Sequence, residues 1–202
     1  MDSGRLEAFS DGVLAIIITI MVLEFRVPHS TDLAALRPLI PVATSYVLSF
    51  VYVGIYWNNH HHMLHVTDRV NGGILWANMH LLFWLSLVPF VTAWMGENNY
   101  AAVPTAAYGI VMLLAAIAYY GLQQTIIRSQ GPRSVLAAAV GSDWKGKLSP
   151  VCYAAAIPTA LAWPAVAGLI YAGLAVLWLV PDQRIERMIA ATTAPDRDQL
   201  AR

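Results

Sequence analysis

The stretch of sequence that decides the fold is residues 98–127, NNYAAVPTAAYGIVMLLAAIAYYGLQQTII, which contains no Asp, Glu, Lys or Arg. A helix needs about 20 mostly apolar residues to cross the roughly 30 Å of hydrocarbon in a bilayer. Residues 38–67 and 70–96 are also free of these four residue types. These three stretches predict transmembrane helices at about 101–127, 40–62 and 72–95.

The composition of the 202-residue chain agrees with a membrane protein. Hydrophobic residues make up 58% of it and charged residues 12%, whereas soluble domains contain about 25% charged residues. The net charge is zero, which predicts no nucleic-acid partner, and the single Cys152 excludes a disulfide framework within one chain. No polar region is large enough for a soluble catalytic domain, so we expect neither an enzyme nor a cofactor.

The first apolar segment is short for a transmembrane helix. Its charge-free part, residues 12–23 (GVLAIIITIMVL), covers roughly 18 Å at 1.5 Å per residue. A helix over about 6–26 therefore places Asp11 and Glu24 at or inside the membrane edges. A carboxylate in that position is costly unless it faces water or a partner. This helix is expected in a protein interior or beside an aqueous path.

The last apolar run, residues 148–180, is too long for one span and short for two. Pro158 and Pro164 flank a natural place for a tight reversal, which predicts helices at about 148–162 and 164–180. Six spans put ten Lys and Arg residues on one side of the membrane and only Arg26 and Arg37 on the other, whereas five spans divide them six against six. The positive-inside rule therefore favours six spans.

The fold class that we predict is an all-α membrane protein with six transmembrane helices and both termini in the cytoplasm. The transmembrane domain is expected over residues 1–181, followed by a cytoplasmic tail over 182–202. The localisation that follows is the cell (inner) membrane, with lipid as a partner.

The first helix carries a narrow stripe formed by Gly12, Ile16, Thr19 and Leu23. At 100° per residue these side chains fall within about 60° of one another. Small residues and Thr are common where membrane helices pack together, so the stripe by itself is also typical of an ordinary helix contact.

The segment around this stripe resembles a known family. The pattern R-x-x-x-F-S-D, here Arg5, Phe9, Ser10 and Asp11, is similar to the signature of the transmembrane protein 175 family of potassium channels. The resemblance continues through residues 15–23, and further matches occur in W-x-x-H-H, in an Asn followed eleven residues later by Pro, and in V-P-D-x-R-I-E (Trp57, His60 and His61; Asn78 and Pro89; Val180–Glu186).

The resemblance implies a homotetramer whose subunits each contribute the first helix to a central pore. The constriction would then consist of Ile16, Thr19 and Leu23. Ile16 would form an apolar ring that gates by dewetting, and Leu23 a second ring. Thr19 would offer oxygens to a partly dehydrated cation. The implied function is a potassium-permeable channel, open to other monovalent cations and weakly selective over sodium, since no T-V-G-Y-G filter is present.

The motif residues admit two roles. Asp11 carboxylates would concentrate cations at the cytoplasmic mouth, or Asp11 and Arg5 would pair with each other and with polar groups of the second helix. Because a buried charge needs a partner, we favour the structural network. Its expected members are the resemblance residues of the first three helices (Arg5, Phe9, Ser10, Asp11, Trp57, His60, His61 and Asn78).

The histidines allow other functions to be considered. His61 and His65 are four residues apart, a spacing that suits zinc, but the sequence supplies neither a third ligand nor a Glu between them, so we expect no metal site. A pH-sensing role for the run His60–His62 is favoured over a metal site, since histidine titrates near neutrality. A proton leak channel is the main alternative function, and a secondary transporter with its break at Pro158–Pro164, or a membrane metalloenzyme, are the others.

Two glycines of the fourth predicted helix, Gly109 and Gly121, are expected to permit close approach of neighbouring helices.

Overall fold

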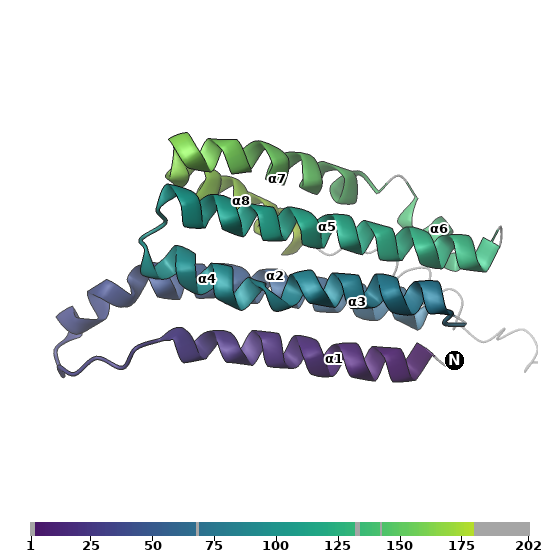
Figure 1. Ribbon diagram of the computed structural model, residues 1–202, viewed down its shortest axis with the longest axis horizontal. Helices are drawn as coiled ribbons and strands as arrows, with labels where there is room; N and C mark the ends of the chain where they lie inside the picture. Colours follow the sequence, from purple (N-terminus) through teal and green to yellow (C-terminus); the bar gives the residue numbers. More distant parts are fainter. Residues whose placement is uncertain (1–2, 68, 132–133, 142, 180–202) are drawn as a thin grey trace, which may run out of the picture.

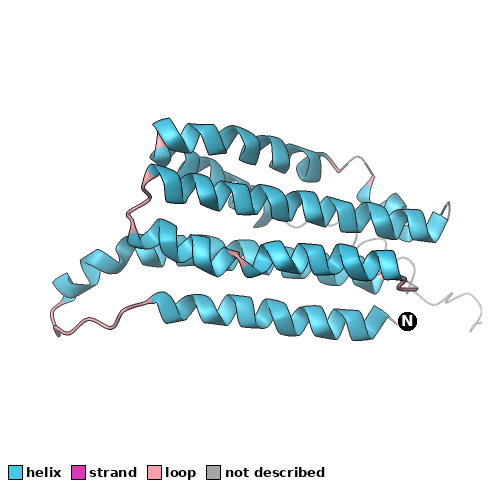
Figure 2. Ribbon diagram, viewed as in Figure 1, coloured by secondary structure: helices cyan, strands magenta, loops and turns pink. Residues whose placement is uncertain are grey.

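The computed structural model describes residues 3–67, 69–131, 134–141 and 143–179, and its regular elements over these residues are all helices. The long helices run in alternating directions and form an elongated antiparallel bundle (Figures 1 and 2). The expected all-α class is confirmed. The predicted tail over 182–202 and the motif match at 180–186 lie outside the described residues.

The helical elements include two short 3-10 helices, η1 and η2. In chain order the elements are α1 (Ser3–Ile20), η1 (Met21–Glu24), η2 (Leu33–Leu39), α2 (Ile40–His65), α3 (Gly72–Ser86), α4 (Val88–Glu97), α5 (Ala102–Gln130), α6 (Val135–Val140), α7 (Trp144–Ala162) and α8 (Pro164–Leu179).

Helix α1 lies at one edge of the bundle, where it packs against α2, α3 and α4 (Figure 1). Its buried residues, Leu6, Ser10, Leu14 and Ile17, recur every three or four positions and so form one face. At 1.5 Å per α-helical residue and 2.0 Å per 3-10 residue, α1 and η1 together extend about 35 Å. The segment thus reaches across the hydrocarbon although its charge-free part alone does not.

The third predicted helix is divided into α3 and α4 at Leu87. Pro89 has no N–H to donate to the carbonyl oxygen of Leu85, so the α-helical hydrogen-bond pattern is interrupted there. At the start of α3, the side chain of Asn71 accepts a hydrogen bond from the backbone N–H of Ile74 at 3.0 Å. This cap fixes the first turn of the helix.

Helix α5 is the central element, in contact with α3, α4, α7 and α8. The connection between α5 and α7 contains the short helix α6. Helices α7 and α8 meet at Trp163, and Pro164 begins α8. Proline is well suited to this position because the first turn of a helix leaves its N–H groups without partners.

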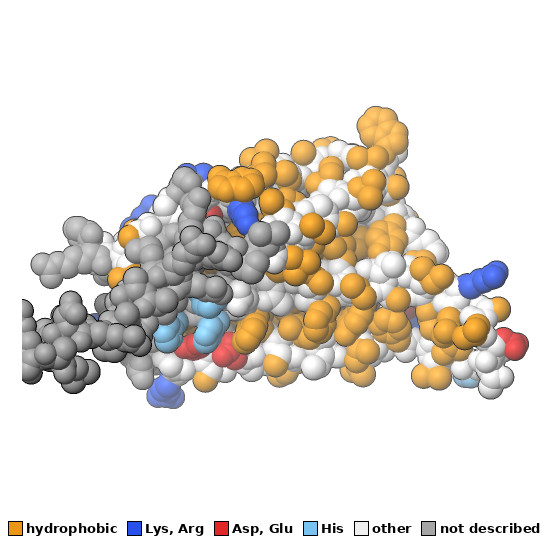
Figure 3. Space-filling model, turned by 180° about the vertical axis from the view of Figure 1, so that it is seen from behind, with side chains coloured by type: hydrophobic (Ala, Val, Ile, Leu, Met, Phe, Trp, Pro, Cys, Tyr) orange, Lys and Arg blue, Asp and Glu red, His pale blue; other side chains and the backbone are white. Residues whose placement is uncertain are grey.

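Several of the apolar helices have the length and composition that a membrane span requires. Among the residues that the structure describes, four segments are long and apolar enough to cross a bilayer (Ser3–Glu24, Leu33–His65, Gly72–Glu97 and Ala102–Gln130). Helix α8 is apolar but has only 16 residues, and α7 begins with Lys145 and Lys147. Apolar side chains cover the middle of the surface in Figure 3, and charged ones gather toward its ends.

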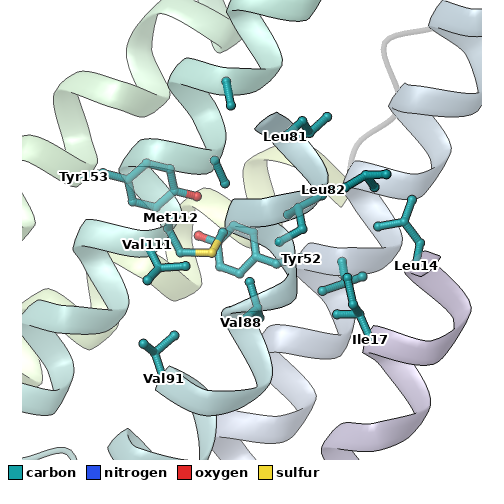
Figure 4. Close-up of a cluster of buried hydrophobic side chains, with 14 of the residues drawn as sticks. Leu14, Ile17, Tyr52, Leu81, Leu82, Val88, Val91, Val111, Met112 and Tyr153 are labelled. Carbon is teal, nitrogen blue, oxygen red and sulfur yellow. The ribbon is translucent and has the colours of Figure 1, made fainter. Parts of the chain in front are cut away.

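The core contains apolar side chains from α1 to α8 together with buried hydroxyl groups. Figure 4 shows Leu14 and Ile17 of α1 on one side of Leu82, and Tyr52 near Met112 and Tyr153. The Tyr52 hydroxyl donates to the backbone carbonyl of Tyr171 at 2.6 Å. Such bonds are needed because a polar group left unpaired away from water is costly.

Close approach of helices depends on Gly109 and not on Gly121. A Cβ at Gly109 would overlap the hydroxyl of Tyr171 and lie 3.1 Å from Ile157 Cγ1, whereas a Cβ at Gly121 would meet nothing within 4 Å. The expected close approach at Gly121 is therefore wrong within a single chain.

We predict that Gly109→Ala destabilises the protein by about 1–3 kcal/mol, because overpacking forces Tyr171 away from its position. Gly121→Ala is the matched control and should be neutral or stabilising by up to about 1 kcal/mol. The measurement is the thermal unfolding midpoint of the purified protein in detergent. Equal midpoints for the two variants would contradict the packing described here.

Candidate pore helix and its polar network

The face of α1 that points away from the bundle carries the predicted stripe. Gly12, Ile16, Thr19 and Leu23 are all exposed in the single chain. Ile16 is 64% exposed and Leu23 75% exposed, while Ile17 on the opposite face is only 4% exposed. Large apolar side chains exposed in this way are available either to lipid or to other copies of the chain.

Two details of the stripe depend on local backbone structure. The Thr19 hydroxyl is directed at the carbonyl oxygens of Ala15 and Ile16, at 2.9 and 3.1 Å, and as donor it leaves its own oxygen free to accept. Leu23 lies in η1 and not in the α-helix. Its direction is therefore set by the tighter 3-10 turn, and not by the 100° step assumed from the sequence.

A buried chain of hydrogen bonds joins α1, α3 and α2. The Ser10 hydroxyl donates to the Leu6 carbonyl at 2.8 Å and accepts from the Asn78 amide at 3.0 Å. Asn78 Oδ1 in turn lies 2.7 Å from His60 Nε2. Because Asn78 Oδ1 is an acceptor, the proton of a neutral His60 is assigned to Nε2. The structure thus brings Ser10, His60 and Asn78 together.

Asp11 is held by Trp57 instead of by Arg5. The Trp57 indole N–H donates to Asp11 Oδ1 at 3.0 Å. Over the described residues of the single chain no Arg5–Asp11 ion pair forms, and the Arg5 side chain is exposed. Phe9 is also exposed. Of the two partners expected for Asp11, the structure therefore shows the contact with the second helix and not the pairing with Arg5.

His61 contacts α1 through Glu7, a residue that the sequence analysis did not single out. Glu7 Oε1 lies 2.6 Å from His61 Nδ1. The His61 ring is stacked with that of Trp57 and with that of His65, at centroid distances of 6.0 and 6.1 Å. Glu7 and Asp11 are four residues apart on one helix, but their proximity to His61 needs the packing of α1 on α2.

A surface groove separates α1 from the α3–α4 segment. Its volume is about 1260 Å³ when the space at its open side is included. Its walls include Ile16 and Ile20 of α1 on one side and Phe90 and Trp94 of α4 on the other. At one end Arg26 and Glu97 form an ion pair at 3.1 Å. The groove continues the exposed face of α1, so one apolar surface extends from the stripe to α4.

These features define a helical membrane protein with one edge helix whose outer face is apolar and whose rotation is fixed by buried polar groups. The family model described as endosomal/lysosomal potassium channel TMEM175 matches residues 5–89. That range holds α1, α2 and α3, with both the exposed stripe and the hydrogen-bonded chain.

Relatives match over more of the chain. A potassium channel of Chryseobacterium sp. (strain P1-3) is 51% identical over 189 residues, which are 94% of this chain and 98% of the relative. The crystal structure of a lysosomal potassium-selective channel TMEM175 homolog from Chamaesiphon minutus superposes with a TM-score of 0.78 at 27% identity, over 89% of this chain and 97% of that one. The endosomal/lysosomal proton channel TMEM175 of Danio rerio is 25% identical over 62% of this chain and 24% of its own length.

The chain belongs to the TMEM175 family, as the resemblance implied. This family is one of ion channels and not a class of enzymes, so the expected channel class is confirmed.

We predict that Asn78→Ala destabilises the protein by about 1–3 kcal/mol, because it leaves the buried His60 Nε2–H without an acceptor and Ser10 without a donor. Asn58→Ala is the control, since Asn58 is exposed on α2, and its effect should lie within about 0.5 kcal/mol. Thermal unfolding of both purified variants gives the comparison. A parent-like midpoint for Asn78→Ala would show that the hydrogen-bonded chain does not stabilise the fold.

Proposed function

We propose that this chain is the subunit of a homotetrameric, potassium-permeable cation channel in which four copies of α1 surround a central pore. The observation that carries the proposal is the exposed apolar face of α1, with Ile16 64% and Leu23 75% exposed on a helix at the edge of the bundle. One such face cannot enclose a pore, so several copies must combine. The groove between α1 and α4 supplies adjoining apolar surface for contact between subunits.

The stripe provides a physical route to weak selectivity. A ring of Ile16 side chains excludes water from a narrow neck, and an ion crosses only when the neck is hydrated. One turn away, the Thr19 hydroxyl oxygens can accept a partly dehydrated cation. Leu23 would form the second apolar ring. Potassium loses hydration water more readily than sodium, which favours potassium without the rigid geometry of a carbonyl-lined filter.

The orientation that we propose follows from the charges at the two ends of the bundle. The start of α1, the α2–α3 connection, the end of α5 and the start of α7 lie at one end (Figure 1). Among the described residues, this end carries Arg5, Arg69, Arg128, Lys145 and Lys147, and the other end carries Arg26 and Arg37. The positive-inside rule makes the first end cytoplasmic, in the cell (inner) membrane, with α7 and α8 as the last two of six spans.

Proton conduction is the second candidate function. It is favoured by the similarity to a vertebrate proton channel and by one buried histidine. His60 is 1% exposed, and its Nδ1 has no hydrogen-bond partner among the described residues. Water wires through a transiently hydrated neck would also carry protons. Reversal potentials measured in pH gradients and in potassium gradients separate the two functions, because a proton channel follows pH and a potassium channel follows potassium.

We predict that Ile16→Asn raises the single-channel conductance and lowers the potassium-over-sodium permeability ratio, because a polar ring keeps the neck hydrated. Leu169→Asn is the control, since Leu169 is 72% exposed on α8, far along the chain from the stripe. Planar-bilayer recordings of the purified variants test this. An Ile16→Asn channel that assembles as the parent does, and conducts and discriminates equally, would show that the constriction lies elsewhere.

A further inference from the structure

The packing of α1 on α2 brings together three side chains that are able to ligate a metal ion. Glu7 and Asp11 of α1 and His61 of α2 each offer one ligand atom, and these three atoms all lie within 4.8 Å of one another. Acidic and histidine side chains lie side by side at the end of the bundle that holds the N-terminus (Figure 3). All three residues are half-buried, so an ion can reach them from the aqueous side.

The donor set and its size suit a divalent first-row transition metal. Zn²⁺ binds imidazole nitrogen and carboxylate oxygen at about 2.0–2.2 Å, which places neighbouring tetrahedral ligand atoms about 3.3 Å apart. Glu7 Oε1 and His61 Nδ1 are 2.6 Å apart, so they need to separate by only about 0.7 Å, within the reach of side-chain rotation. Three protein ligands leave a fourth position for water.

Neighbouring groups already orient two of the three ligands. The Trp57 indole donates to Asp11 Oδ1, which leaves Oδ2 free for another partner. The rings of Trp57 and His65 stack on the His61 imidazole. Partners of this kind typically change metal affinity by about 10- to 100-fold, because they fix the direction of the ligand atoms.

The charges in the cluster favour a divalent cation over the ion pair alone. A protonated His61 balances only one of the two carboxylates, and the second then has the neutral Trp57 indole as its partner. An ion of charge +2 balances both carboxylates and accepts the neutral imidazole as a ligand. It also removes the repulsion between two acidic groups that are four residues apart on one helix.

We propose that Glu7, Asp11 and His61 form a binding site for one divalent transition-metal ion per chain. The bound ion would join the N-terminal part of α1 to the C-terminal part of α2. The site needs only the α1–α2 packing of a single chain, so it does not depend on ion conduction.

The test uses the purified full-length chain in detergent, free of any histidine tag, with Zn²⁺ as the probe. We expect one bound Zn²⁺ per chain by equilibrium dialysis with elemental analysis, and a rise in the unfolding midpoint when Zn²⁺ is added. Glu7→Gln and His61→Gln should each weaken binding by more than about 100-fold and abolish the rise, because losing a ligand exceeds the loss of an orienting partner. His29→Gln, in the distant α1–α2 connection, should bind as the parent does.

Three outcomes would overturn the proposal. The first is the absence of stoichiometric Zn²⁺ on the parent chain. The second is equal binding of Zn²⁺ by the parent and by Glu7→Gln. The Glu7 side chain is not part of the buried core, so Glu7→Gln remains a valid test if His61→Gln fails to fold. The third is loss of binding in His65→Gln but not in Glu7→Gln, which would assign the ion to the His61–His65 pair.

Discussion

The hydrogen-bonded chain from Ser10 through Asn78 to His60 fixes the rotation of α1 about its own axis. In a membrane interior no water is available to form hydrogen bonds with a buried polar group. Breaking this chain therefore leaves several polar groups unpaired at once. Thr19 follows Ser10 by nine residues, or about 900° of helical turn, which places it on the opposite side of α1. The polar face inside the bundle and the exposed stripe outside it are therefore consequences of one constraint.

Contacts at the two ends of the first helical segment explain how a helix with a short charge-free stretch is accommodated. The carboxylates of Glu7 and Asp11 lie near one end of α1, where they contact His61 and Trp57 of α2. At the other end η1 extends the helix to Glu24, and Arg26 pairs with Glu97 of α4. Charged side chains at both membrane edges thus have partners or access to water, as their cost requires.

Much of the fold could be predicted from the sequence because charge-free stretches reveal membrane helices directly. The R-x-x-x-F-S-D motif also indicates the family to which the chain belongs. The division of the third helix at Leu87 does not follow from the presence of Pro89 in the sequence, since a proline within a membrane helix is often tolerated. The expected contact of Asp11 with a polar group of the second helix is made by Trp57. The contact of Glu7 with His61 could not be predicted, because it depends on how α1 is positioned along α2.

The proposal that the exposed face of α1 lines the pore is tested most directly by placing a single cysteine on that face. In a Cys152→Ser background, Ile16→Cys would put four thiols around the proposed neck, and Ile17→Cys would put them in the core, where Ile17 is 4% exposed. Thiolates are strong ligands for soft metal ions such as Cd²⁺. The account predicts that Cd²⁺ blocks the current through Ile16→Cys and leaves the Ile17→Cys and background channels unaffected. Block of Ile17→Cys but not of Ile16→Cys, or no difference between them, would contradict it.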